Sequence, residues 1–340
     1  MIDLHFHIGL HKTGTTYLQT GLVRNRAALA ARGVHLVDKP TSYPGDHALW
    51  LLLRREGPIA FAGTLAAAAA AKDARAMMVS SEQFGLHLRD PEAARSLAAA
   101  LAPAFRTRVY IWLRRQDTLR ESVYSQSVKR VAVGGIRDKL WYGYDFDAWL
   151  RTIEDAFGRD ALTVRLYHDR RRDDVLSEFL ALAGIDLPDL DRPQEVNVSP
   201  SRRETLFMAG VSKASVARAA TIMRCVQADR CIADDGLRTL LSPAERRDFL
   251  AGHLEGNRRL ADRHDFPPED RDWLTSLPPQ DPEWFPPAPI SAAERRAVWR
   301  ACMGRTLGGG GRSFGLWPAL RLAATLASRP VAAPPGAGTL

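Results

Sequence analysis

Short apolar segments alternate with longer stretches of mixed polarity over the first 190 residues of the chain. Their length and their content of Val, Ile, Leu and Met are typical of strands that are buried on both faces of a sheet. Five such segments predict five strands, over residues 4–8, 34–37, 77–79, 109–113 and 162–166.

The stretches between these strands have helical periodicity. Leu18, Leu22 and Leu29 share one face of a helix that we predict over residues 15–31. Further helices are predicted after Asp117 as an N-cap, over residues 145–157, and over residues 173–183 with Gly184 as the closing residue. The alternation predicts a three-layer α/β fold with a central, mainly parallel sheet of about five strands.

After about residue 190 the alternation stops. Helices are predicted over residues 201–226 and 243–264, and a proline-rich stretch over residues 267–289 holds Trp273, Trp284 and Phe285, which is typical of a packed segment. Four consecutive glycines begin at Gly308, and the chain ends in VAAPPGAGTL. We therefore expect a core over residues 1–190, a helical and proline-rich extension over 191–306 that packs on the core, and a poorly ordered tail over 307–340.

Composition narrows the class of protein. The 340 residues are 46% hydrophobic and 25% charged, which is ordinary for a globular protein. Three cysteines without a CxxC pair argue against structural zinc and a disulfide framework. The first residues lack a cationic signal-peptide start, and no stretch of about 18 apolar residues occurs. These features predict a cytoplasmic protein without a transmembrane segment.

The charge balance favours an anionic ligand. The net charge is +8, from 41 arginines and 6 lysines against 39 acidic residues. High arginine and alanine content also follows from genome composition, so the charge alone leaves both explanations open. No basic run is interleaved with aromatic residues, so we expect no nucleic-acid partner.

The segment between the first predicted strand and helix has the composition of a phosphate-binding turn. Residues 9–16 read Gly-Leu-His-Lys-Thr-Gly-Thr-Thr. A glycine-rich turn from a strand into a helix directs several backbone N–H groups at one point, where the helix dipole adds positive charge. The spacing of Gly9 and Gly14 matches the start of a P-loop. We therefore expect a P-loop-like fold whose first loop binds a phosphate ester.

The position of its lysine separates this loop from that of P-loop nucleotide triphosphatases. Those proteins carry a lysine directly after the second glycine, where it contacts the β- and γ-phosphates; this chain has Thr15 there. Its lysine is Lys12, inside the turn, and a compact ammonium group suits a single bridging oxygen. The alternative is a solvated lysine in a tight turn. His11 either contacts the ligand or caps the strand.

A second set of polar side chains follows the strand predicted at residues 109–113. Arg114 would leave the carboxyl edge of the sheet, on the same rim as the glycine-rich loop, and Ser122 lies about two turns into the next helix. A guanidinium and a hydroxyl group in this arrangement can hold a second phosphate. Arg115 and Arg120 are interpreted as surface charges.

Together the two motifs resemble those of the sulfotransferase family that uses 3′-phosphoadenosine 5′-phosphosulfate (PAPS). The loop His-Lys-Thr-Gly-Thr-Thr resembles the family's 5′-phosphosulfate motif. Arg114 at the end of a strand, with Ser122 and Tyr124 after it, resembles the 3′-phosphate motif. The order and placement of the motifs agree, and the resemblance covers about residues 1–190, including a late helix at residues 179–185.

The resemblance implies PAPS as the co-substrate and no metal ion. It implies that Lys12 stabilises the bridging oxygen and that Arg114 and Ser122 bind the 3′-phosphate. It assigns the 5′-phosphosulfate to the loop residues His11, Lys12, Thr13, Gly14, Thr15 and Thr16. Members of the family often supply a further basic loop from the C-terminal third, for which Arg202 and Arg203 are candidates here.

Two residues are candidates for the base that deprotonates the acceptor hydroxyl. Glu82 follows the strand predicted at residues 77–79 and resembles the glutamate that glycan-type sulfotransferases use. The alternative for Glu82 is an acid that interacts with a helix dipole. His47 is the competing base, because other branches of the family use histidine; its alternative is an ordinary residue at the start of a helix.

The sequence thus favours a PAPS-dependent sulfotransferase that acts on an acceptor hydroxyl. A carbohydrate is the first expectation for the acceptor, and a small natural product or a lipid headgroup is the second. A P-loop small-molecule kinase is the first rival, and it requires the lysine that this loop lacks. A catalytically inactive nucleotide-binding module is the second rival.

Overall fold

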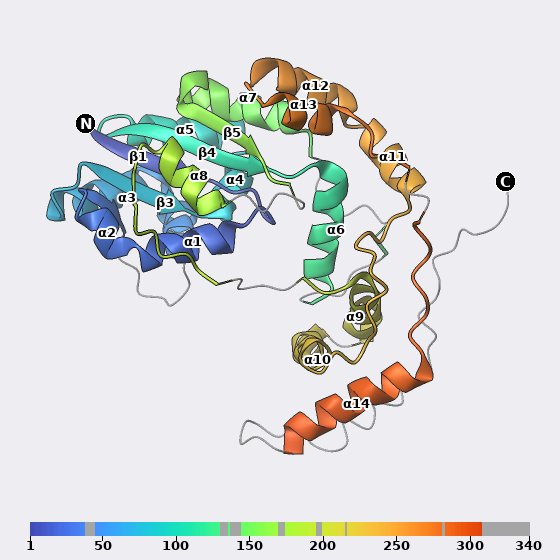
Figure 1. The fold of residues 1–340 in the computed structure, drawn as a ribbon. Coiled ribbons are helices and arrows are strands. Elements are labelled where there is room, and N and C mark those ends of the chain that lie inside the picture. Colours follow the sequence, from blue (N-terminus) through green and yellow to red (C-terminus); the bar gives the residue numbers. More distant parts are fainter. Residues whose placement is uncertain are drawn as a thin grey trace. The chain divides into compact units, whose positions relative to one another are not determined.

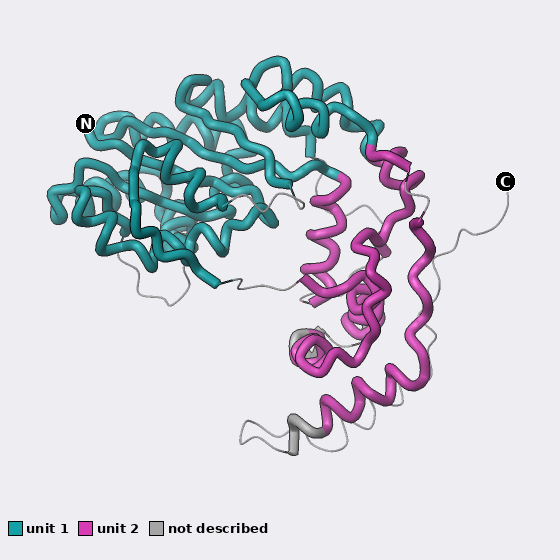
Figure 2. Tube along the Cα trace, in the orientation of Figure 1, with its two compact units in different colours: residues 1–116, 143–197, 250–277 teal, residues 117–142, 198–249, 278–340 magenta. Residues whose placement is uncertain are grey.

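The computed structural model describes residues 1–37, 45–129, 135–136, 144–168, 174–194, 199–214, 216–280 and 283–307. The chain divides into two compact units, shown in different colours in Figure 2. The first, here named the sheet unit, comprises residues 1–116, 143–197 and 250–277; the second, the helical unit, comprises residues 117–142, 198–249 and 278–340. Residues 250–277 thus belong to the sheet unit, whereas residues 308–340 of the expected tail lie outside the described part of the chain.

The sheet unit is built on five parallel strands, as the sequence pattern predicts. In the sheet they lie in the order β2-β3-β1-β4-β5. The strands are β1 (Ile2–His7), β2 (Val34–Leu36), β3 (Ala76–Ser80), β4 (Phe105–Leu113) and β5 (Leu162–Leu166). Strand β4 begins four residues before the predicted run, because its first half alternates buried and exposed residues while it pairs with β1 from Ile2 and Phe105 onward.

One face of the sheet is covered by α1 (Thr15–Arg24), α2 (Arg26–Ala30) and α8 (Val175–Leu182), which Figure 1 shows beside the strands. Its core is aromatic: the ring centroid of Phe179 lies 5.1 Å from that of Tyr110 and 6.1 Å from that of Trp112. Such pairs of buried rings stabilise the contact beyond the area that they bury.

The opposite face is covered by four helices: α3 (His47–Ala71), α4 (Glu82–His87), α5 (Pro91–Leu101) and α7 (Phe146–Phe157). Phe6 of β1 packs on Phe84 and Phe61, with ring centroids 4.7 and 6.4 Å apart. A short 3₁₀ helix (Arg159–Ala161) leads into β5, and α12 (Leu254–Arg263) and α13 (Pro268–Thr275) complete the unit. The fold class is therefore confirmed as a three-layer α/β fold with a parallel sheet.

The helix predicted over residues 15–31 is interrupted at Asn25. Helix α1 ends before Asn25 and α2 begins after it. The Asn25 side chain donates from Nδ2 to the carbonyl oxygens of Gly21 and Asp191, both at 2.8 Å. Because asparagine competes with the helix by bonding local backbone groups, the chain breaks at this residue.

The helical unit contains α9 (Arg202–Ala214), α10 (Val216–Ala228), α14 (Ala292–Leu307), most of α6 (Gln116–Ser127) and most of α11 (Pro243–Ala251). Its core holds Met208, Val211, Ile222, Val226 and Val298. Helix α6 begins two residues earlier than predicted, so Asp117 lies in the first turn rather than at the N-cap. In the described ranges, no helix is long and apolar enough to cross a membrane.

Candidate functional site

The strand order places the switch point of the sheet between the carboxyl ends of β1 and β4. These strands are neighbours, but the chain leaves β1 toward β2 on one side and leaves β4 toward β5 on the other. Where connections diverge in this way, the loops leave a crevice at the carboxyl edge of a parallel sheet. The glycine-rich loop follows β1 and Arg114 follows β4, so both predicted motifs begin at this point.

The glycine-rich loop has an unusual backbone. Gly9, Lys12 and Gly14 have φ angles of 110°, 68° and 76°, in the left-handed region. A lysine there costs about 1–2 kcal/mol, and such strain is concentrated at functional sites. The Thr13 hydroxyl donates to the carbonyl oxygen of Leu10 at 2.7 Å, which holds the turn together.

Helix α1 begins directly after this turn. Gly14 is its N-cap and provides no side-chain cap, and no acidic residue lies in its first turn. A Cβ atom on Gly14 would lie 3.4 Å from both Tyr167 and Val175, so the loop is closely packed from behind. The N–H groups of Thr15 and Thr16 belong to the positive end of the helix, which favours an anion.

Arg114 links the second predicted motif to the loop. Its Nη1 donates to the carbonyl oxygen of Lys12 at 3.1 Å, and its guanidinium lies 5.9 Å from the ring centroid of Tyr167. The structure therefore brings Arg114 and Lys12 together. Ser122 lies in α6 within the helical unit, so its pairing with Arg114 stays a prediction.

The interpretation of Arg115 as a surface charge is wrong. Its side chain is buried, donates from Nη1 to the carbonyl oxygen of Trp273 at 2.9 Å and lies 4.7 Å from the Trp273 ring centroid. Arg120 is also a structural residue, since it donates to the Ile136 carbonyl oxygen and packs on Phe249. Arginine side chains pack through their flat apolar surface as readily as they face solvent, which the sequence alone does not distinguish.

Glu82 lies beside the glycine-rich loop. It is the first residue of α4, after Ser81, whose hydroxyl accepts from the Gln83 N–H. A Cβ atom on Gly9 would lie 3.1 Å from the Cα and Cβ atoms of Glu82, so only glycine fits here without displacement. One carboxylate oxygen lies 3.8 Å from Nδ1 of His11. The structure thus brings Glu82, His11 and the start of the loop together.

His47 is the first residue of α3 and lies at the same end of the sheet. The Asp46 N–H donates to the Ser80 carbonyl oxygen at 2.8 Å, and the Ser80 N–H donates to the Asp46 carboxylate at 2.7 Å. Because Ser80 is the last residue of β3, these bonds attach the start of α3 to the end of this strand, two residues before Glu82. The imidazole of His47 is exposed and lies 5.0 Å from the ring centroid of Trp50.

The sequence analysis missed two buried polar residues, His7 and Gln19. His7 ends β1, and its Nδ1 lies 2.7 Å from the Ser80 hydroxyl. Burial lowers the pKa of His7 to about 3, so its ring is neutral. Gln19 lies on the buried face of α1 and contacts Glu82. Both stand at positions that the apolar pattern assigns to the interior, which was the signal available in the sequence.

Arg202 and Arg203, the candidates for a nucleotide-binding loop, are bound inside the helical unit. Arg202 donates to Asp235 at 2.8 Å and its side chain is fully buried. Arg203 holds both carboxylate oxygens of Glu294, at 2.7 and 2.9 Å. Burial alone would raise the pKa of Glu294, but the bonds from Arg203, Ser291 and Ala233 lower it to about 2. These arginines are therefore parts of the scaffold.

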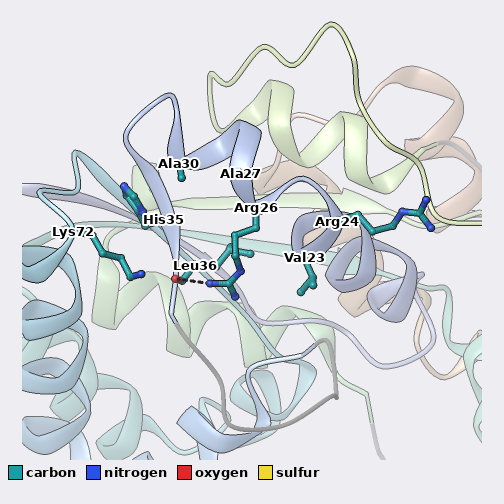
Figure 3. A pocket seen from close by; sticks show the side chains of 8 residues that line it. All are labelled: Val23, Arg24, Arg26, Ala27, Ala30, His35, Leu36 and Lys72. Carbon is teal, nitrogen blue, oxygen red and sulfur yellow. Dashed lines mark hydrogen bonds between the residues drawn. The ribbon is translucent and has the colours of Figure 1, made fainter.

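A separate cavity of about 480 Å³ lies beside β2, the edge strand (Figure 3). It is lined by Val23, Arg24, Arg26, Ala27, Ala30, His35, Leu36 and Lys72. Arg24 is bound to Asp191, and Arg26 donates to the carbonyl oxygens of Leu36 and Val37. None of the predicted site residues lines this cavity.

Cysteine and other metal-binding side chains form no centre in the described part of the chain. Cys225 and Cys231 are buried, Cys302 is partly buried, and all three are free thiols. Across the same residues, no three His, Cys, Asp or Glu side chains are grouped so that they could hold a metal ion.

Comparison with known proteins gives one likeness. No family model matches the chain, and no curated protein matches it in sequence. Among solved structures, it is similar to the crystal structure of a sulfotransferase from Alicyclobacillus acidocaldarius, with a TM-score of 0.35 and 17% sequence identity. The match covers 66% of this chain and 96% of that chain.

Proposed function

We propose that the protein transfers the sulfuryl group of PAPS to an acceptor hydroxyl, with a carbohydrate as the first acceptor class to test. The observation that carries the proposal is the rim of the sheet unit. There the guanidinium of Arg114 donates to the carbonyl oxygen of Lys12 in the strained turn, and the backbone of Glu82 packs on Gly9 at the start of the same turn. The Glu82 carboxylate lies 3.8 Å from the side chain of His11 in that turn. The rim therefore has positive groups that can bind an anionic sulfuryl donor and a carboxylate that can accept the proton of an acceptor hydroxyl.

The donor side rests on residues 11–16. The first N–H groups of α1 and the hydroxyls of Thr15 and Thr16 suit the oxygens of a 5′-phosphosulfate, and the ammonium group of Lys12 suits its bridging oxygen. Arg114 follows the neighbouring strand and suits the 3′-phosphate as a bidentate donor. Ser122 completes the 3′-phosphate site in this proposal, in keeping with the resemblance of the motif.

The acceptor side rests on Glu82. In the reaction, an acceptor oxygen forms a bond to sulfur while the bond between sulfur and the bridging oxygen breaks. The acceptor hydroxyl gives its proton to the Glu82 carboxylate, and the leaving 5′-phosphate of adenosine 3′,5′-bisphosphate (PAP) keeps the bond electrons. Lys12 stabilises the charge that grows on that oxygen. His47 is assigned to acceptor binding, because it is exposed and adjoins the segment that is bonded to Ser80.

Nucleotide selectivity is the first test of the donor. PAP and PAPS bind the native state and should raise the melting temperature by mass action, whereas ATP should do much less because it lacks a 3′-phosphate. The measurement is a thermal shift at matched nucleotide concentrations, with Arg114→Ala as the variant that should lose the difference. Equal stabilisation by ATP would contradict the assignment of the second motif.

Transfer itself is tested with labelled sulfate. We expect transfer from PAPS to a hydroxyl within a panel of carbohydrates, lipid headgroups and small natural products, with no requirement for a divalent ion. A kinase needs Mg²⁺ to neutralise its phosphates. Activity that EDTA abolishes and Mg²⁺ restores would favour the kinase, and PAP binding without turnover would favour the inactive module.

A further inference from the structure

Gln19 is a buried amide in the helix that begins at the phosphate-binding turn. It lies one helical turn after Thr15 on the inner face of α1, and the residue is 1% exposed. Long polar side chains are seldom buried to this extent without a specific partner. The position of its amide in the candidate active site is therefore informative.

The nitrogen of this amide has two acceptors, both at the end of β3. Nε2 donates to a carboxylate oxygen of Glu82 at 3.1 Å and to the carbonyl oxygen of Ser80 at 3.4 Å. A carboxylate and a carbonyl can only accept, so the amide nitrogen must face them. If the amide were turned over, its oxygen would face the Glu82 carboxylate and repel it.

The oxygen of the same amide is buried and has no hydrogen-bond partner within the described residues. It lies against the backbone of Gly45, where a Cβ atom would come within 2.7 Å of it. A buried acceptor left without a donor is unfavourable. The amide therefore keeps an orientation in which its nitrogen donates to Glu82 while its own oxygen accepts no hydrogen bond. This is expected if the role of Gln19 is to bind the Glu82 carboxylate.

The Glu82 carboxylate thus lies between Gln19 of α1 and His11 of the turn that precedes α1. One oxygen accepts from Gln19 of α1, and the other lies 3.8 Å from Nδ1 of His11 in the turn. Glu82 itself begins a different helix, α4. The position of the base relative to the donor site is consequently determined by side-chain contacts as well as by the loops.

From this arrangement we propose that Gln19 is a positioning residue, which fixes the Glu82 carboxylate relative to the phosphate-binding turn. The inference rests on the proposed function, in which Glu82 is the base. Gln19 does not touch the reacting atoms; it acts through the hydrogen bond that it donates to the Glu82 carboxylate. Its loss should therefore lower turnover and leave donor binding in place.

Gln19→Met tests this role, because methionine keeps the length of the side chain and removes the donor. We expect kcat to fall roughly 10- to 100-fold, as when a catalytic group is misplaced by about 1 Å, with PAP affinity and melting temperature nearly unchanged. The KM for PAPS should stay nearly unchanged, so that the loss lies in kcat, and Gln19→Glu should lower kcat at least as far, since it replaces the donor by a second carboxylate. Gln83→Met, at the residue that follows Glu82, is the matched control and should change neither kcat nor KM.

Gly45→Ala tests the same contact from the opposite side. The added methyl group has to displace the Gln19 amide, so this variant should reproduce the kcat loss at nearly unchanged KM for PAPS without altering Gln19 itself. Where a Gln19 variant fails to fold, this substitution provides the measurement. A melting temperature and PAP affinity that fall together with kcat in both variants would mean a merely structural role and overturn the proposal.

A readout without substrate separates this inference from the proposed function. The side-chain amide signal of Gln19, assigned with Gln19→Met, should move in Glu82→Gln and in Gly45→Ala and stay in place in Gln83→Met. If the wild type transfers no sulfuryl group from PAPS, the proposed function fails, while this signal still decides the contact. An unmoved amide signal together with unchanged kcat in Gln19→Met overturns the positioning role, even where sulfuryl transfer is established.

Discussion

Charged side chains have different surroundings in the two units. At the rim of the sheet unit, the side chains of His11 and Glu82 keep 24% and 15% of their surface exposed and lie 3.8 Å apart. In the helical unit, Arg202 is completely buried in its pair with Asp235, and Arg203 holds both oxygens of Glu294. A charge that is buried in an ion pair inside the protein serves the scaffold, whereas one that keeps part of its surface at the rim of the sheet can act on a ligand.

This difference separates two kinds of arginine that look alike in the sequence. Arg114 and Arg203 both belong to Arg-Arg pairs next to a helix. Arg114 contacts the carbonyl oxygen of the strained Lys12, whereas Arg203, in the first turn of α9, is bound to Glu294 of α14. Substitutions at the rim should therefore affect turnover, and substitutions at the buried pairs should affect stability.

The largest effect is expected from Glu82→Gln. Glutamine keeps the shape of the side chain and removes its basicity, so kcat should fall by about 10²–10⁴, the usual cost of losing a general base. PAP affinity and stability should stay nearly unchanged. His47→Ala, the comparison variant, should weaken acceptor binding more than turnover. Normal turnover in Glu82→Gln together with an inactive His47→Ala would reverse the two assignments.

Lys12→Ala should lower kcat by about 10²–10³, as when one preorganised electrostatic donor is lost. Lys12→Arg should restore little, because a planar guanidinium does not replace a point charge in a tight turn. Lys72→Ala provides a control, since this lysine lines the separate cavity beside β2. Steady-state kinetics with PAPS measure all three variants, and near-normal kcat in Lys12→Ala would leave the loop with a binding role alone.

The sheet could be predicted because each strand is an apolar segment bounded by polar or turn-forming residues. Strand β5 has the predicted bounds, and β3 extends the predicted run by residues that are also buried. Boundaries failed where side-chain bonds decide them: Asn25 interrupts the first helix, and Asp117 accepts from Arg246 at 2.6 Å instead of capping α6. The bonds of Asn25 to Asp191 and of Asp117 to Arg246 join residues far apart in the sequence, so no local pattern announces them.

The candidate site could be predicted only where glycine spacing or the end of a strand determines the position of a residue. Glycine spacing predicted the turn after β1, and the position of Glu82 at the end of β3 follows from the parallel sheet. The attachment of His47 depends on Asp46 and Ser80, which no periodicity connects. The contact of Gln19 with Glu82 joins two helices through one amide, and only the folded chain shows it.

Arg203→Met addresses the other half of the comparison. It leaves the partly buried Glu294 carboxylate without its guanidinium, so the helical unit should lose about 3 kcal/mol of stability, the lower end of the range for buried pairs. Replacing both partners, as Arg203→Met with Glu294→Leu, should recover much of this loss. Urea unfolding measures the stability, and PAP titration of the folded variant checks its affinity. A loss of PAP affinity at unchanged stability would make Arg203 a nucleotide contact after all.

The smallest effect concerns pH, to which the two units should respond in opposite directions. In the helical unit, burial raises the pKa of Glu121 to about 7, against the bonds that it accepts from the N–H groups of Leu241 and Leu240. In the sheet unit, burial lowers the pKa of His7 to about 3. The folded state therefore favours a proton on Glu121 and disfavours one on His7.

The sign follows from linkage between protonation and folding. The stabilising contribution of Glu121 is complete below its ordinary pKa of 4.5 and is lost as the pH rises to about 7, whereas that of His7 is complete above 6.5 and is lost toward 3. Glu121→Gln should remove the first dependence and stabilise the helical unit at pH 8 by roughly 2–4 kcal/mol relative to the wild type, with little difference at pH 4.5.

Native-state amide exchange at several pH values, corrected for intrinsic rates, reports α10 and β1 separately in one sample. Protection of α10 that rises with pH in the wild type, or a benefit of Glu121→Gln that is equal at both pH values, would show that Glu121 does not hold its proton in the folded state.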